Sequence, residues 1–289
     1  MTEPVNNPVV THLLVKELLA KSQIPKPTAM GTPFRYSSAF ACGRQQGYMA
    51  FDAEPTEPMD EAGAWLTGLG TIIHEALQEA ISRTYADAEF ELGTGTEYVS
   101  GSCDALIPFT ELGGTHILYE LKTMGTYSFD KQVGWKRMRG EWNYPEGPAA
   151  KAIAQAGMNA LGIEASRPGV VIETVVMGSI TFEALSKQKA DKMGVEGYHR
   201  VLAEFHIPRS QWEPIALAEL ARIEGLHFAI TSGYIPERVA LDDNGIVLQL
   251  DPKGNAWQCA YCAFRSLCEE DGGGQVWINQ SNLVRRNQD

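Results

Sequence analysis

The spacing of hydrophobic and polar residues along this chain predicts a succession of helices and strands. Apolar residues at helical spacing predict three long helices, over residues 64–85, 149–161 and about 209–230. Gly162 is predicted to end the second of these helices. Alternating or β-branched residues predict strands over 98–109, 115–123, 170–180, 205–208 and 246–250. This succession predicts an α/β fold with a central mixed sheet flanked by helices.

Proline-rich and polar stretches divide the chain into one main domain and two terminal segments. Residues 1–30 contain a short amphipathic helix followed by Pro25 and Pro27, and they are interpreted as an N-terminal appendage. Residues 31–270 form the predicted domain, and residues 271–289 form a polar tail. With 289 residues and 44% hydrophobic content, the chain is long enough to bury a large core.

Three charged residues lie on two strands that are predicted to be neighbours. The glycines within residues 111–114 favour a hairpin connection, which places Asp104 and Glu120 on paired strands. The two-residue period of a strand puts Lys122 on the same face as Glu120. The two carboxylates are suitable ligands for Mg²⁺ or Mn²⁺, and the lysine can hold an attacking water or offset phosphate charge. The set indicates metal-dependent phosphodiester hydrolysis, although Glu-x-Lys on a strand is also common as a solvated polar face.

The residues next to Asp104 and Glu120 in the sequence are predicted to lie on the opposite face of the sheet. Leu121 points into the core, and its carbonyl oxygen remains available to a metal ion. Cys103 directly precedes Asp104 and is interpreted as a buried, unreactive thiol.

These strand residues resemble the core of the PD-(D/E)xK nucleases. The resemblance is carried by Gly101-Ser-Cys-Asp104 and Glu120-Leu-Lys122, and the proline usual in the first motif is absent. Gly70-Thr-Ile-Ile-His74 is similar to the histidine motif of RecB-like nucleases. The resemblance implies a restriction-endonuclease-like core in which the imidazole is a further metal ligand. The metal ligands are then expected to be His74, Asp104, Glu120 and Leu121.

One helix extends this resemblance. Gln155 occupies the place of the family's Gln-x-x-x-Tyr motif, which implies that it helps to orient the scissile phosphate, and Asn159 stands in place of the tyrosine. Lys151, one helical turn earlier, is expected to share the face of Gln155. The residues expected to act in catalysis are Asp104, Glu120, Lys122 and Gln155.

Four of the five cysteines form a pattern typical of metal binding. Cys259, Cys262 and Cys268 lie close together, and Cys42 lies far upstream. The sequence shows no signal peptide, so the expected compartment is the cytoplasm of a bacterium or phage-infected host, where clustered thiols bind metal rather than form disulfides. This spacing suits zinc or an iron–sulfur cluster. The lack of a second C-x2-C pair counts against an independent zinc ribbon, which makes Cys42 the natural fourth ligand.

The same cysteine arrangement around a RecB-like core is similar to nucleases that carry an iron–sulfur staple. These are the Cas-four family of CRISPR systems, AddB-type nuclease domains and related phage exonucleases. The resemblance covers about residues 40–270 and implies exonucleolytic cleavage of DNA in recombination, repair or phage genome processing. It also implies a [4Fe-4S] cluster that stabilises the domain by clamping its two ends. The implied cluster ligands are Cys42, Cys259, Cys262 and Cys268.

Two other functions stay open from the sequence. One is a structure-specific endonuclease or a prespacer-trimming enzyme of CRISPR adaptation. The other is a non-catalytic DNA-binding subunit, which Asn159 favours and the intact carboxylate and lysine set opposes. Expected partners are the ends of single-stranded or duplex DNA, and a second copy of the chain or a recombination or CRISPR protein. No membrane association is expected.

The net charge of −12 excludes a protein that coats nucleic acid through general electrostatic attraction, so any DNA contact must be local. The best local mixture of cations and aromatic rings lies in a predicted loop over residues 131–144. Single strands bind such surfaces by phosphate attraction and base stacking. A solvated loop with partly buried tryptophans would have the same composition. The residues expected to contact DNA are Lys131, Trp135, Lys136, Arg137, Arg139 and Lys151, with Trp142 and Tyr144 beside them.

Overall fold

The computed structural model describes residues 32–134, 137–138, 141–142, 147–248, 256–273 and 276–277. Its centre is a six-stranded mixed sheet in the order β1-β3-β4-β7-β8, with β2 also paired to β3. The strands of this sheet are β1 (Phe34–Arg35), β2 (Glu89–Gly95), β3 (Val99–Pro108), β4 (His116–Met124), β7 (Thr174–Thr181) and β8 (Leu202–Pro208). Two smaller ladders pair β5 (Arg137–Met138) with β6 (Glu141–Trp142) and β9 (Tyr234–Ile235) with β10 (Val276–Trp277).

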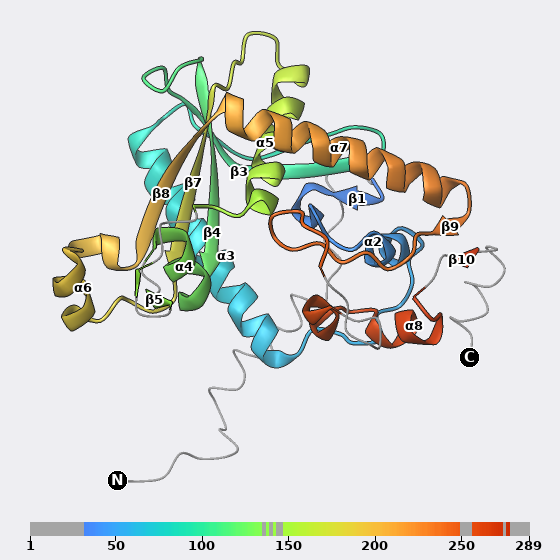
Figure 1. Ribbon diagram of the computed structural model, residues 1–289. Coiled ribbons are helices and arrows are strands. Elements are labelled where there is room, and N and C mark those ends of the chain that lie inside the picture. Colours follow the sequence, from blue (N-terminus) through green and yellow to red (C-terminus); the bar gives the residue numbers. More distant parts are fainter. Residues whose placement is uncertain are drawn as a thin grey trace, which may run out of the picture.

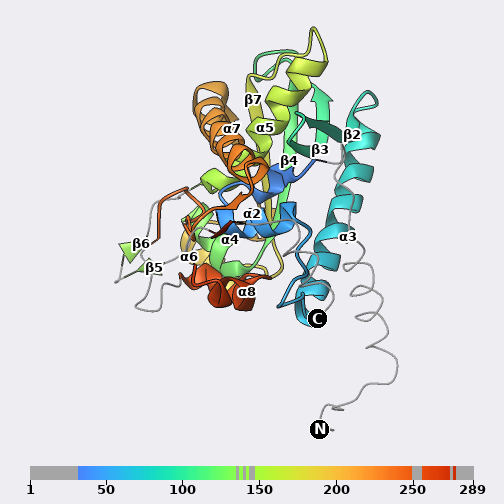
Figure 2. The same ribbon diagram turned by 90° about the vertical axis from the view of Figure 1, so that its right-hand side faces the viewer.

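Helices cover both faces of the central sheet (Figures 1 and 2). On one face, Ile81 of α3 (Glu61–Thr84) shares a buried cluster with Leu121. On the other face, Ile153 of α5 (Ala150–Ser166) and Trp212 of α7 (Arg209–Thr231) share a cluster with Met177. The predicted α/β fold with a central mixed sheet flanked by helices is confirmed. Among the described helices, none is both long enough and apolar enough to cross a bilayer. The α-helices are α2 (Gly43–Ala50), α3 (Glu61–Thr84), α4 (Thr126–Val133), α5 (Ala150–Ser166), α6 (Lys187–Met193), α7 (Arg209–Thr231) and α8 (Arg265–Glu270), and the 3₁₀ helices are η1 (Tyr36–Ser38), η2 (Gly197–Arg200) and η3 (Trp257–Tyr261).

Gly162 does not end α5, which continues to Ser166. The helix needs a glycine at this position because β2 crosses it at very short range. A Cβ atom on residue 162 would lie 1.6 Å from the Oγ1 atom of Thr94. The prediction that the helix ends at Gly162 is therefore wrong, since this glycine permits close packing rather than a left-handed helix end.

The strand predicted over 246–250 is also wrong for the residues that the structure describes, which reach 248 in this segment. The chain instead makes a tight turn in which the Asp242 N–H donates to the Ile246 carbonyl at 2.8 Å, and Gly245 adopts a φ of 77°. A single bridge pairs Leu241 with Val247. The turn closes the segment on itself and keeps it out of the central sheet.

β3 changes its neighbour along one edge. β1 pairs with the start of β3, and β4 pairs with β3 only from Ala105 onward, while β2 pairs along the opposite edge. Gly101 lies between these two pairings, where a Cβ atom would approach the ring of Tyr36 to 2.5 Å. Between Gly101 and Asp104, one edge of β3 therefore has no paired strand, although β3 lies inside the sheet. This stretch is called the open edge of β3.

The two ends of the domain pack against each other. Tyr48 of α2, Ile235 of β9 and Phe264 share one buried cluster. The Glu57 N–H donates to the Ala263 carbonyl at 3.0 Å, which ties the loop after α2 to the segment before α8. Both views show α2 above α8, and Figure 1 shows the two helices away from the strands β7 and β8 (Figures 1 and 2). The predicted N-terminal appendage, and most of the predicted tail, lie outside the described residues.

Candidate active site and thiol cavity

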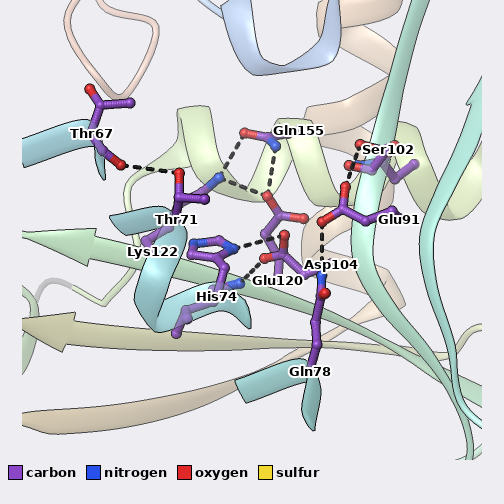
Figure 3. Close-up of polar contacts among 12 residues, drawn as sticks. Thr67, Thr71, His74, Gln78, Glu91, Ser102, Asp104, Glu120, Lys122 and Gln155 are labelled. Carbon is purple, nitrogen blue, oxygen red and sulfur yellow. Dashed lines mark hydrogen bonds and ion pairs between the residues drawn. The ribbon is translucent and has the colours of Figure 1, made fainter. Parts of the chain in front are cut away.

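Asp104 joins three elements of the fold. Its Oδ2 atom accepts a hydrogen bond from the Leu121 N–H at 2.6 Å, where β4 is no longer paired with β3. Its Oδ1 atom lies 3.2 Å from Nδ1 of His74 on α3 (Figure 3). Because no strand pairs with this edge of β3, the Asp104 side chain can bond to the backbone of β4. The same carboxylate also holds the His74 imidazole in place.

Glu120, Lys122 and Gln155 form a closed triangle of hydrogen bonds (Figure 3). The Lys122 Nζ atom donates to Glu120 Oε1 at 2.7 Å and to Gln155 Oε1 at 2.8 Å, and Gln155 Nε2 donates to Glu120 Oε1 at 2.6 Å. The two strand residues share a face of β4, and Gln155 reaches them from α5. Three of the four residues expected from the sequence to act in catalysis therefore contact one another.

The second carboxylate oxygen of Glu120 is the least satisfied atom of this site. Glu120 is only 2% exposed, and its Oε2 atom has no hydrogen-bond partner among the described residues. Burial raises the pKa of Glu120 above its ordinary value, and the nearby Asp104 adds to this effect, while Lys122 opposes it. A buried carboxylate oxygen without a partner is costly, and a cation at this position would offset that cost.

The donor set suits a hard divalent cation. Asp104 and Glu120 could supply oxygen ligands, and the His74 imidazole, which lies 3.2 Å from Asp104 Oδ1, could supply a nitrogen ligand. Within the ranges that the structure describes, no three His, Cys, Asp or Glu side chains converge closely enough to form a complete metal site. The side chains of the site thus form two contacting groups. Asp104 contacts His74 in one group, and Glu120 contacts Lys122 and Gln155 in the other.

Glu91 is a site residue that the sequence did not reveal. It lies on β2 with a φ of 50°, a left-handed conformation that is uncommon outside glycine. Its carboxylate accepts hydrogen bonds from Gln78 Nε2 at 2.8 Å and from Ser102 Oγ at 3.4 Å (Figure 3). Glu91 therefore bridges the helix that carries His74 and the strand that carries Asp104. No local pattern marks this role, because it depends on how β2 pairs with β3.

Asn159, which stands in place of the tyrosine of the Gln-x-x-x-Tyr motif, makes a hydrogen bond inside the protein. It is fully buried, and its Nδ2 atom donates to the Ser102 carbonyl at 3.1 Å. Ser102 lies on the open edge of β3, so Asn159 supplies a hydrogen bond that a neighbouring strand would otherwise make. A residue in this place cannot stack on a nucleotide.

The four cysteines expected to bind a cluster line one cavity of about 390 Å³. Cys42 directly precedes α2, Cys259 lies in η3, Cys262 follows η3, and Cys268 lies in α8. All five cysteines are free of disulfides. Burial raises the pKa of Cys262, and the other three thiols of the cavity raise it further. The fold therefore places the remote Cys42 and the C-terminal triplet around one cavity, and among the described residues no three of these thiols converge closely enough to hold a metal ion.

Cys103 is separate from this cavity. It is 0% exposed and belongs to the core cluster between the sheet and α5. Burial raises the pKa of its thiol to about 12. Its predicted position in the core is confirmed.

The residues expected to contact DNA are only partly described. Lys131 lies in α4 and not in a loop, because that helix continues to Val133 and ends at Gly134 with a φ of 76°. Lys151 lies near the start of α5 and lines the thiol cavity, whereas Gln155 on the same helix reaches Glu120. The backbone of Arg137 and Trp142 forms part of β5 and β6. The remaining residues of this group lie outside the described residues: Trp135, Lys136, Arg139 and Tyr144.

Comparison with known proteins gives only distant similarities. No family model matches the chain, and no curated protein matches it. The crystal structure of SSO0001 is 18% identical with a TM-score of 0.45, covering 90% of this chain and 96% of that chain. The crystal structure of a phage-related exonuclease from Haemophilus somnus 129PT is 10% identical with a TM-score of 0.38, covering 66% of this chain and 81% of that chain. Both similarities are too distant to establish a family or an activity.

Proposed function

We propose that this protein is a metal-dependent deoxyribonuclease of the PD-(D/E)xK type that degrades DNA from its ends. The observation that carries the proposal is the arrangement of Glu120. Its buried carboxylate is held by Lys122 and Gln155 beside the Asp104–His74 pair, with one oxygen left without a partner among the described residues. Buried charges in such groupings are uncommon unless they serve binding or catalysis.

The proposed ligands of Mg²⁺ or Mn²⁺ are His74, Asp104, Glu120 and the carbonyl of Leu121. A divalent cation bound there would supply an activated water and would neutralise charge on the phosphate. Asp104 supports this role because its hydrogen bonds with Leu121 and His74 fix the direction of its carboxylate. The two groups around Asp104 and Glu120 would draw together through their shared attraction to a cation.

Lys122 and Gln155 are proposed to act on the substrate side of the site. The Lys122 ammonium has three donors, two of which are engaged by Glu120 and Gln155. The third has no partner among the described residues and could donate to the attacking water or to a phosphate oxygen of the scissile bond. Gln155 fixes the ammonium by accepting a hydrogen bond from it, and Gln155 therefore helps to set the direction of the remaining N–H donor.

A structural [4Fe-4S] cluster is proposed for the thiol cavity. Thiolates are the preferred ligands of iron–sulfur clusters, and the four thiols of this cavity come from both ends of the domain. Such a cluster would join α2 to the segment from η3 to α8, and its contribution would be stability rather than reaction with DNA. Protein purified without oxygen is expected to be brown and to contain iron, and Cys42→Ser is expected to lose both properties. Colourless protein that contains zinc would contradict the cluster.

The nuclease activity is tested with end-labelled linear single-stranded and duplex DNA, with Mg²⁺ or Mn²⁺ and with a chelator. We expect metal-dependent release of nucleotides from linear DNA and no cleavage of closed circles or end-blocked DNA. Cleavage of circles would favour the structure-specific endonuclease. Binding of DNA without any cleavage by the wild-type chain would favour the non-catalytic subunit, and metal-dependent cleavage that survives Lys122→Ala would contradict the mechanism.

A further inference from the structure

The thiol cavity contains an arginine that contacts sulfur directly. Arg238, which follows β9, donates from Nε to the Sγ atom of Cys268 at 3.2 Å. A second nitrogen of the same guanidinium donates to the Cys268 carbonyl at 3.3 Å. One planar cation therefore contacts both the side chain and the backbone of a single cysteine.

The chain around Arg238 is shaped to hold this guanidinium in place. Its backbone N–H donates to the Gly273 carbonyl at 2.8 Å, so the segment after β9 is tied to the residues that follow α8. A Cβ atom on Gly273 would lie 2.9 Å from one guanidinium nitrogen of Arg238 and 3.1 Å from its Cζ atom. Gly273 also has a φ of 72°. A glycine here leaves the space in which the guanidinium lies against the backbone.

Arg238 lines the same cavity as Cys42, Cys259 and Cys262. A guanidinium is permanently charged in proteins, so its field acts on any anion that these thiols hold.

We propose that Arg238 is a positioning residue for the iron–sulfur cluster, and that it sets the reduction potential of the cluster through its hydrogen bond to Cys268. This inference rests on the cluster part of the proposed function. A cluster held by four thiolates is an anion whose negative charge increases on reduction. A fixed cation and an N–H···S hydrogen bond therefore stabilise the reduced form more than the oxidised form, which raises the potential.

A second arginine of the same cavity offers a matched control. Arg265 also lines the cavity, but its Nε atom is bonded to Glu269 at 3.0 Å on the exposed side of α8. Replacing Arg265 removes one positive charge from the same region without removing a hydrogen bond to Cys268. The comparison separates a specific effect of Arg238 from a general effect of charge.

The experiment uses the full chain, purified without oxygen, and measures the midpoint potential of the cluster by redox titration with electron paramagnetic resonance. Arg238→Met is expected to shift the midpoint to more negative values and to speed the loss of iron to a chelator several-fold. Arg238→Lys, which keeps the charge, should shift it less than Arg238→Gln, and Arg265→Met should leave it near the wild-type value.

Equal midpoints for wild type, Arg238→Lys and Arg238→Gln would overturn the inference, and these two variants decide the matter if Arg238→Met loses the cluster altogether. A wild-type chain without iron would overturn the cluster and this inference together. A wild-type chain that holds iron, with potentials that do not respond to Arg238, would overturn the inference alone.

Discussion

The carboxylate of Asp104 accepts a hydrogen bond from the backbone N–H of Leu121 at 2.6 Å, at the point where β3 has separated from β4. This contact gives Asp104 a structural task beside its proposed task as a metal ligand. Two substitutions separate the tasks. Asp104→Asn keeps an acceptor oxygen for Leu121, whereas Asp104→Ala leaves a partly buried N–H without a partner.

We therefore expect Asp104→Ala to lower the free energy of unfolding by about 1–3 kcal/mol, the cost of an unsatisfied buried donor. Asp104→Asn should cost less in stability, and both variants should lose metal-dependent DNA cleavage. Urea unfolding and the cleavage assay check the two effects separately. An Asp104→Asn enzyme with wild-type activity would contradict a metal ligand at this position.

Lys122→Ala should lower the rate of DNA cleavage by about 10²–10³-fold, the usual effect of removing one group that stabilises charge in the transition state. The measurement is the rate of nucleotide release from linear DNA at saturating Mn²⁺. Lys187, an exposed lysine on α6, serves as the control, and Lys187→Ala should cleave at the wild-type rate. Equal losses in the two variants would point to a general effect of charge.

Binding of Mn²⁺ should stabilise the folded chain. A ligand at a hundred times its Kd adds about 2.7 kcal/mol to the free energy of unfolding, which raises the melting temperature by several degrees. Glu120→Gln and Asp104→Asn should lose most of this increase, because each removes a carboxylate ligand. Thermal melts with and without Mn²⁺ measure it. An undiminished increase in both variants would place the metal elsewhere in the chain.

The Cys103 thiol should make stability depend on alkaline pH. Burial raises its pKa from 9.0 to about 12, so the folded protein keeps the proton while the unfolded chain loses it. The stabilisation is complete below pH 9 and is lost as the pH rises toward 12. Cys103→Ala removes this contribution, so the stability gap between wild type and variant should be about 1 kcal/mol narrower at pH 10 than at pH 8. Urea unfolding at the two pH values measures the gap, and a constant gap would show that the thiol ionises equally in both states.

Two glycines inside helices should respond to alanine in opposite directions. Gly162→Ala places a methyl group against Thr94 and should destabilise the fold by about 1–3 kcal/mol. Gly225, on α7, has nothing within 4 Å of its Cβ position, and Gly225→Ala should stabilise the fold by about 0.5–1 kcal/mol. Denaturation midpoints of the two variants test the pair. If Gly162→Ala instead stabilised the fold, β2 would have to shift away from α5 at little cost in free energy.

Local sequence patterns predicted the features that residues close together in the sequence determine, such as which side chains share a strand face. The two-residue period located Glu120 and Lys122 on one face of β4, whereas Gln155 was identified through the resemblance to the Gln-x-x-x-Tyr motif of a nuclease family. Glu91 and Arg238 escaped prediction because each is defined by a partner on another element, Ser102 in one case and Cys268 in the other. No sequence pattern around Glu91 or Arg238 indicates these contacts, so they are visible only in the folded structure.

The packing of Tyr48 with Ile235 and Phe264 also fixes an order of events during synthesis. The ribosome completes α2 early, but the residues that cover Tyr48 are among the last to emerge. At about 5–20 residues per second, α2 waits on the order of ten to forty seconds for Phe264. Until Phe264 emerges, the buried cluster around Tyr48 is incomplete, so truncated products that stop before Phe264 should aggregate or be degraded while the full-length chain folds.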